Sequence, residues 1–192
     1  MKKRRILACA VLIACLSMGA YGSFAYFTAD ATATNVITAG NIKIELKETA
    51  IPEDGGNPVP FEDQTGVMPG QVISKIVQIE NTGEQSAYIR VKVEKEISLS
   101  EGVNGDPDLS LVTCNFNTGK WEEKDGYYYY KDALQAGETT EPLFTEVVFD
   151  KTMGNMYQDS KAEIRVYAQA TQTANNGTSA MEASGWPKED NE

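Results

Sequence analysis

The sequence contains no histidine among its 192 residues. This absence excludes Ser-His-Asp and Cys-His catalysis and every zinc site that needs an imidazole ligand. Basic residues are also scarce, because 17 Lys and Arg stand against 28 Asp and Glu and leave a net charge of −11. Nucleic-acid binding depends on concentrated positive charge, so we expect no nucleic-acid partner. The lack of histidine and the scarcity of basic residues therefore favour a binding or structural role.

The N-terminus has the pattern of a signal peptide. Met1 to Arg5 reads MKKRR, and the apolar run that follows, Ile6 to Ala20, has 15 residues. A membrane-spanning helix needs about 20 apolar residues, so we expect cleavage and no transmembrane anchor afterwards. Ser23 and Ala25 form a small-x-small cleavage site, which assigns residues 1–25 to a signal peptide and makes Tyr26 the first mature residue.

Cleavage at that site also changes the charge and the cysteine count. Four positive charges leave with the signal peptide, which takes the net charge from −11 to −15. Of the three cysteines only Cys114 remains, so no intrachain disulfide can form, and Cys114 is expected to be a small buried hydrophobic residue. The alternative is lipidation at Cys15, which follows Leu12, Ile13 and Ala14 in the manner of a lipoprotein site.

The mature chain has the pattern of an all-β protein. Apolar and polar residues alternate in several short runs, and Gly, Pro and Asn turn signals separate them. No helical stripe long enough for a βαβ crossover occurs, so we predict one antiparallel β-sandwich, jelly-roll-like, over residues 26–173. Lys47 to Val67 is expected to be a surface loop, and 174–192 a flexible acidic tail onto which Trp186 could fold back. The expected core strands include Ile42–Leu46, Val72–Glu80, Ile89–Val93, Phe144–Phe149 and Ile164–Ala170.

A tyrosine hairpin is predicted between Trp121 and Lys131. Asp125-Gly126 is a preferred two-residue hairpin turn, and four tyrosines follow it. In the simpler interpretation, alternate tyrosines cover the core and the others lie outside. In the other, they form an aromatic surface for a glycan or a protein. The residues of this candidate surface are Tyr127, Tyr128, Tyr129 and Tyr130.

Several segments of the chain resemble one family. The most specific match is the start of the mature chain, where Tyr26-Phe27-Thr28-Ala29-Asp30 is followed by Asn35, by Thr38-Ala39-Gly40 and by an alternating strand. The sequence resembles the TasA and camelysin-like proteins, which are exported by bacteria with leaders cut by a SipW-type signal peptidase. Further matches are Met68-Pro69-Gly70, Val77–Gly83, Ala87–Val93, Trp121 with Asp125–Tyr130, Gly137–Thr140 and Tyr167–Gln172.

The resemblance implies a secreted jelly-roll protein of the extracellular matrix or cell surface, and for TasA a subunit of biofilm fibres. Its partners would be the SipW-type peptidase and then itself or a related matrix subunit. In such fibres the N-terminal segment of one subunit adds as a strand to the next, so 26–38 is the candidate donor strand, with Phe27, Val36 and Ile37 as anchors. The alternative is that 26–38 forms an edge strand of its own sandwich.

Two other functions are alternatives. Camelysin-like relatives are described as metallopeptidases, but without histidine only acids and one Cys could hold a metal, so we expect no enzyme and no cofactor. Acidic pairs such as Glu53-Asp54 and Glu122-Glu123 are expected to be solvated charge, with weak extracellular Ca²⁺ binding as the lesser possibility. A surface adhesin or glycan-binding module would use the tyrosine hairpin.

Overall fold

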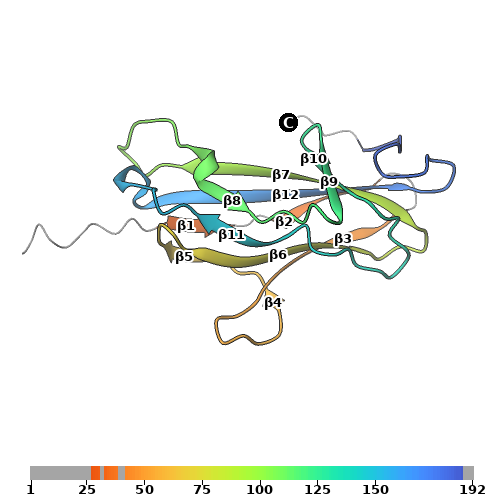
Figure 1. The fold of residues 1–192 in the computed structure, drawn as a ribbon, viewed down its shortest axis with the longest axis horizontal. Coiled ribbons are helices and arrows are strands. Elements are labelled where there is room, and N and C mark those ends of the chain that lie inside the picture. Colours follow the sequence, from red (N-terminus) through yellow and green to blue (C-terminus); the bar gives the residue numbers. More distant parts are fainter. Residues whose placement is uncertain (1–26, 31–32, 39–41, 188–192) are drawn as a thin grey trace, which may run out of the picture.

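This computed structural model describes residues 27–30, 33–38 and 42–187. Their strands form two β-sheets packed face to face (Figure 1). Helical structure among them is confined to two short 3-10 turns, η1 (Leu109–Leu111) and η2 (Asn155–Tyr157). No helix in the described ranges is long and apolar enough to cross a membrane. The all-β sandwich predicted from the sequence is confirmed.

The larger sheet has seven strands, and two long central strands organise it. β7 (Ala87–Ser98) and β12 (Ser160–Gln172) pair antiparallel over twelve residues of each. The hairpin strands β9 (Trp121–Lys124) and β10 (Tyr127–Tyr130) extend the sheet beyond β7. On the other side of β12 lie β1 (Phe27–Asp30), then β5 (Gln64–Val67), while β2 (Ala33–Thr38) lies beside the second half of β12.

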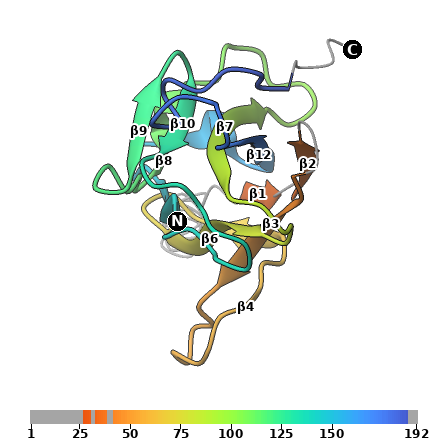
Figure 2. The same cartoon turned by 90° about the vertical axis from the view of Figure 1, so that its right-hand side faces the viewer.

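The smaller sheet has the strand order β4-β3-β6-β11-β8. Its central strand is β6 (Val72–Asn81), between β3 (Ile44–Ala50) and β11 (Phe144–Phe149). The edge strands β4 (Val59–Pro60) and β8 (Val112–Cys114) are only two and three residues long. Figure 2 shows the segment around β4 projecting away from both sheets.

The core lies between the sheets and is built mainly by alternation along the strands. Along β6, burial alternates residue by residue from Val72 to Asn81, and Val77 and Ile79 on the inner face are fully buried. The first part of β12 contributes inner residues in the same way, because successive side chains of a strand point to opposite faces. In β11 a register shift between Phe144 and Glu146 interrupts the alternation, and Phe144, Val147 and Phe149 are the buried residues. All the core strands expected from sequence are present.

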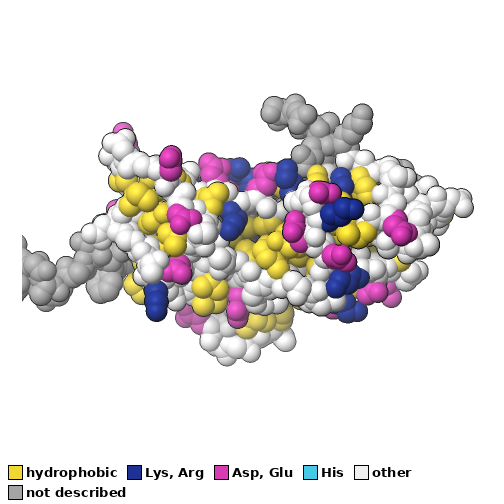
Figure 3. Space-filling view, turned by 45° about the horizontal axis from the view of Figure 1, so that its top comes forward, with side chains coloured by type: hydrophobic (Ala, Val, Ile, Leu, Met, Phe, Trp, Pro, Cys, Tyr) yellow, Lys and Arg dark blue, Asp and Glu magenta, His cyan; other side chains and the backbone are white. Residues whose placement is uncertain are grey.

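The outer face of the larger sheet carries charge of both signs. Lys92 Nζ lies 2.9 Å from Glu94 Oε1, and Arg165 Nη2 lies 2.8 Å from Glu96 Oε2. Figure 3 shows acidic and basic side chains interspersed on the face that it presents. Exposed pairs of this kind add little stability, but they keep a sheet face solvated.

Two features differ from the sequence-based prediction. β1 and β2 pair parallel to β12, although an antiparallel sandwich was expected. A parallel pair needs a crossover, and here almost the whole domain lies between the two partners, so short-range sequence patterns carry no sign of the pairing. The predicted loop from Lys47 to Val67 contains the end of β3, β4 and β5, and Val67 is 1% exposed because its side chain packs in the main core.

Candidate functional site

The candidate donor segment lies along β12 of its own chain. Phe27 to Asp30 pair with Ser160 to Glu163, and the second strand pairs with Val166 to Ala170. β1 is also paired on its other side with β5. In this single chain the segment is therefore an integral part of the larger sheet. This arrangement agrees with the alternative in which the segment forms a strand of its own sandwich. Exchange between subunits stays a prediction.

Of the three predicted anchor residues, Val36 is the one whose side chain the structure describes. Val36 is half-buried and packs against the main core. Phe27 and Ile37 lie within β1 and β2, and their side chains fall outside the described residues. The cleavage residues Ser23, Ala25 and Tyr26 precede the first described residue, as does the whole signal peptide.

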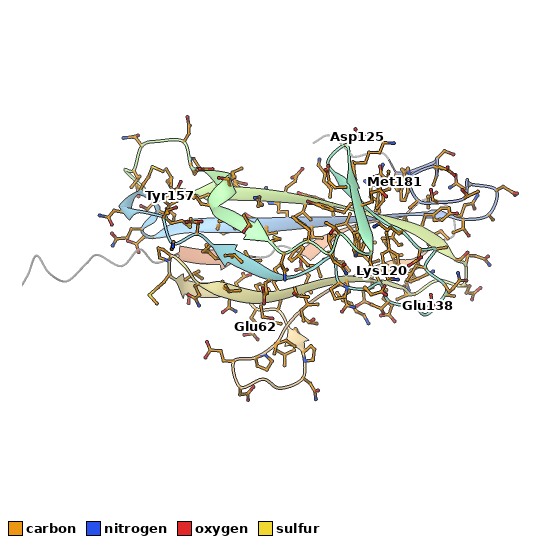
Figure 4. The ribbon with its side chains drawn as sticks, viewed as in Figure 1. Glu62, Lys120, Asp125, Glu138, Tyr157 and Met181 are labelled. Atoms are coloured by element: carbon orange, nitrogen blue, oxygen red, sulfur yellow. The ribbon has the colours of Figure 1, made fainter. Side chains whose placement is uncertain are left out.

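The tyrosine hairpin forms with the predicted turn. Asp125 and Gly126 have φ angles of 53° and 80°, and two positive φ values in a row characterise the type I′ turn that suits twisted hairpins. Tyr127 pairs with Lys124, and Tyr130 pairs with Trp121. Figure 4 shows Asp125 at the tip of the hairpin and Lys120 near its other end.

The four tyrosines do not share one surface, because alternate side chains point to opposite faces. Tyr128 and Tyr130 pack toward the main core, where Tyr128 stacks on Phe116 at 4.2 Å between ring centroids. The Tyr130 hydroxyl donates a hydrogen bond to the Glu141 carboxylate. Burial, together with this carboxylate, raises the pKa of Tyr130 to about 12. The simpler interpretation therefore describes this pair.

Tyr127 and Tyr129 lie on the outer face around Arg90. The Arg90 guanidinium carbon is 4.0 Å from the Tyr127 ring centroid and 4.7 Å from that of Trp186. Arg90 Nε also donates to Gln169 Oε1 at 2.8 Å, and Nη1 donates to the Tyr129 hydroxyl at 3.3 Å. A guanidinium between aromatic faces is a favourable cation–π arrangement.

The C-terminal segment covers this outer aromatic face. Ala180 is 1% exposed and packs with Tyr88 and Tyr129, and the Tyr88 hydroxyl donates to the Gly177 carbonyl at 3.3 Å. Figure 4 shows Met181 of the same segment close to the hairpin. The segment predicted as a flexible tail is therefore packed on the sheet as far as Trp186, because its few apolar side chains pack against the tyrosines. Residues 188–192 lie outside the described residues.

One buried pair was missed by sequence reasoning. Lys75 lies on the inner face of β6, and its Nζ is 2.8 Å from Glu48 Oε1 of β3. Their side chains are 2% and 6% exposed. Burial lowers the pKa of Lys75, although Glu48 opposes this shift. The available signal was the position of Lys75, which alternates in step with Ile73, Val77 and Ile79.

Cys114 and the acidic pairs show no arrangement beyond the expected one. Cys114 is half-buried against the core, and burial raises the pKa of its thiol to about 11, which makes it a poor nucleophile. The residues of the acidic pairs are exposed. Within the described ranges no three His, Cys, Asp or Glu side chains lie close enough together to hold a metal ion. The acidic residues concerned are Glu53, Asp54, Glu62, Asp63, Asp106, Asp108, Glu122 and Glu123.

Comparison with known proteins identifies no relative. No protein-family model matches the chain, no curated protein is similar to it, and no solved structure resembles it at a significant level.

Proposed function

We propose that this chain is a secreted structural protein of an extracellular bacterial matrix, which assembles by adding residues 26–38 of one subunit as a strand to the next. The observation that carries the proposal is the position of the N-terminal strands. β1 and β2 together run along β12, and among the described residues their strand partners are β12 and, for β1, β5. The same main-chain bonds could be made by a segment from another subunit.

The other sheet edges support this choice of segment. An unpaired edge is a template for another chain, and short or charged edge strands suppress such pairing. β4 and β8 are only two and three residues long, and β9 exposes Glu122, Glu123 and Lys124. Uncontrolled association through these edges is therefore disfavoured, and departure of β1 and β2 would expose the longer edge of β12 as an acceptor.

Timing and charge fit the same proposal. Tyr26 becomes a free N-terminus only if the predicted signal peptide is removed, so the donor would be released after export. A mature net charge of −15, obtained by removing the four basic leader residues from a chain at −11, makes subunits repel one another. Salt screens this repulsion, so light scattering should report faster assembly as ionic strength rises.

The test uses the chain beginning at Tyr26 and a variant that lacks Tyr26 to Asn35. We expect the full mature chain to form fibres under the electron microscope, whereas the shortened variant stays a folded monomer by sedimentation. A synthetic peptide of residues 26–38 should then bind the shortened variant, and a scrambled peptide of the same composition should not. Equal assembly by the shortened variant would show that strand donation is wrong.

The two alternative functions gain no support of their own. The acidic pairs that could serve a metallopeptidase are spread over separate loops and one hairpin. The outer tyrosines, which a glycan-binding module would use, are packed against Arg90 and the C-terminal segment. Neither observation favours a second proposal.

A further inference from the structure

Lys75 is a lysine inside the sandwich core. It points to the same face of β6 as Val77 and Ile79, which are fully buried, and its own side chain is 2% exposed. An ammonium group in such a place loses its hydration, and this loss favours the neutral amine. A neutral lysine amine in an apolar pocket is a nucleophile.

Glu48 is the group that this amine faces. It is paired with Val77 across the β3–β6 ladder, so it shares the inner face with Lys75 as a diagonal neighbour. Lys75 Nζ lies 2.8 Å from Glu48 Oε1, and apart from this contact neither atom has a hydrogen-bond partner among the described residues. The carboxyl carbon, Glu48 Cδ, is bonded directly to the contacted oxygen. Reacting groups held in this way have a very high effective concentration.

The surroundings of the pair exclude water. The Phe61 ring covers Lys75, with Nζ 4.2 Å from the ring centroid. Apolar side chains of both sheets line the pocket beside it, among them Ile73, Phe149 and Ile164. A buried ion pair whose two contacting atoms make no further hydrogen bonds is an expensive arrangement, since the attraction must offset the loss of hydration of two charges. A neutral amide in the same place would remove that cost.

We propose that Lys75 and Glu48 are joined by an intramolecular isopeptide bond in the folded protein. A proton first passes from the ammonium to the carboxylate, which gives a neutral amine and a neutral acid. The Nζ lone pair attacks Glu48 Cδ, an Nζ–Cδ bond forms, and a Cδ–O bond breaks. The departing hydroxyl takes a proton from the nitrogen and leaves as one water molecule, so the step needs no oxidant or other reactant.

The bond would join β3 to β6 and close a covalent loop around residues 49–74. That loop contains β4 and β5, and β5 is a partner of β1. The described part of the chain has one cysteine and therefore no disulfide of its own. The cross-link would supply the covalent constraint that disulfides supply in other exported proteins. This inference is independent of strand donation, because it concerns a single chain.

Digestion of the denatured protein with a lysine-specific protease tests the bond directly. Residues 48–75 contain no lysine before Lys75, and the next lysine is Lys92. Because an acylated lysine is not cleaved, we expect one fragment of residues 48–92, lighter than its sequence mass by one water molecule. Tandem mass spectrometry should map the lost water to Lys75 and Glu48. Two separate fragments, 48–75 and 76–92, at full mass would overturn the proposal.

Matched variants separate this bond from incidental modification. Lys75→Arg also yields fragment 48–92, because arginine is not cleaved, but at its full sequence mass. Glu48→Ala yields the two separate fragments. Lys47, which precedes Glu48 in β3, forms a partly exposed ion pair with Glu80 of β6, so Glu80→Gln serves as the control and should keep the loss of water. Loss of water in Lys75→Arg would place the modification elsewhere and overturn the proposal.

Discussion

Arg90 and Trp186 are in contact across 96 residues of sequence, with the guanidinium carbon 4.7 Å from the indole ring centroid. Arg90 belongs to β7 in the middle of the larger sheet, and Trp186 belongs to the segment after β12. The Trp186 ring also meets Tyr129 edge-on at 5.9 Å between centroids. This contact holds the C-terminal segment on the sheet.

Replacing Trp186 should therefore loosen that segment without unfolding the sandwich. In Trp186→Ala the cation–π contact and the edge-on ring contact are lost, and we expect local opening of residues 174–187 to become easier by about 1 kcal/mol. Hydrogen exchange measured by mass spectrometry would show faster exchange there and unchanged exchange in β6 and β7. The control is Lys151→Ala, because Lys151 is exposed and lies outside residues 174–187. Unchanged exchange in the segment would contradict the role of Trp186.

The fold should be sensitive to substitution of Asn81, a polar residue of the smaller sheet. It is fully buried, and its Nδ2 donates to the carbonyls of Gln85 at 2.8 Å and Leu134 at 3.0 Å. Its Oδ1 accepts from Gly83 N at 3.0 Å. Asn81→Ala removes all three bonds and leaves Gly83 N without its side-chain partner, while the Leu134 carbonyl keeps its bond from Ala87 N, so we expect the free energy of unfolding to fall by about 3 kcal/mol. Urea denaturation measures this loss, and Asn104→Ala in an exposed turn should stay within about 0.5 kcal/mol of the wild type.

Two glycines should respond to alanine for different reasons. At Gly83 a Cβ would lie 3.0 Å from Lys43 N, so Gly83→Ala forces the backbones of two segments apart. At Gly126 nothing lies within 4 Å, and the only cost is the left-handed φ of 80°. We expect a loss of about 2 to 3 kcal/mol at Gly83 and about 1 kcal/mol at Gly126. Thermal unfolding shows which of the two variants loses more stability. An equal loss would show that the backbone around Gly83 shifts without cost to admit the added Cβ.

Stability should decline at alkaline pH through Tyr130. Burial raises its pKa to about 12 in the folded chain, whereas an unfolded tyrosine titrates near pH 10. Between these values the unfolded chain has lost the proton and the folded chain keeps it, so unfolding becomes more favourable as pH rises. Tyr130→Phe should remove that part of the slope. Chemical denaturation at pH 9 to 11, in about half-unit steps, would measure it, and an equal slope in both proteins would contradict the assignment.

Several elements of the fold could be predicted because their causes are local. Alternation placed β3, β6, β7, β11 and β12, since a strand with one buried face must repeat every second residue. Asp125-Gly126 predicted the hairpin because few residue pairs accept two positive φ angles. The division of the four tyrosines between two faces also follows from this alternation, although which pair faces the core does not.

The candidate site was predicted less completely, because it depends on contacts between distant segments. Val36 lies in a strand as expected, but the sequence did not indicate that its strand would run parallel to β12. Lys75 was placed in a strand, yet its burial beside Glu48 requires the register of β3 against β6. The sequence indicates that Trp186 could fold back onto the sandwich, but it does not identify Arg90 as the residue that Trp186 contacts.

The sequence by itself determined the secondary-structure type, the turns and the excess of negative charge, because each depends on neighbouring residues or on simple counts. Only the tertiary structure decided which strands are partners, which lysine is buried and what covers the outer tyrosines. Those outcomes depend on hydrogen bonds and packing between segments far apart in the sequence, such as β1 and β12, whose paired residues Phe27 and Ser160 are 133 positions apart, and many alternative pairings satisfy the same local pattern.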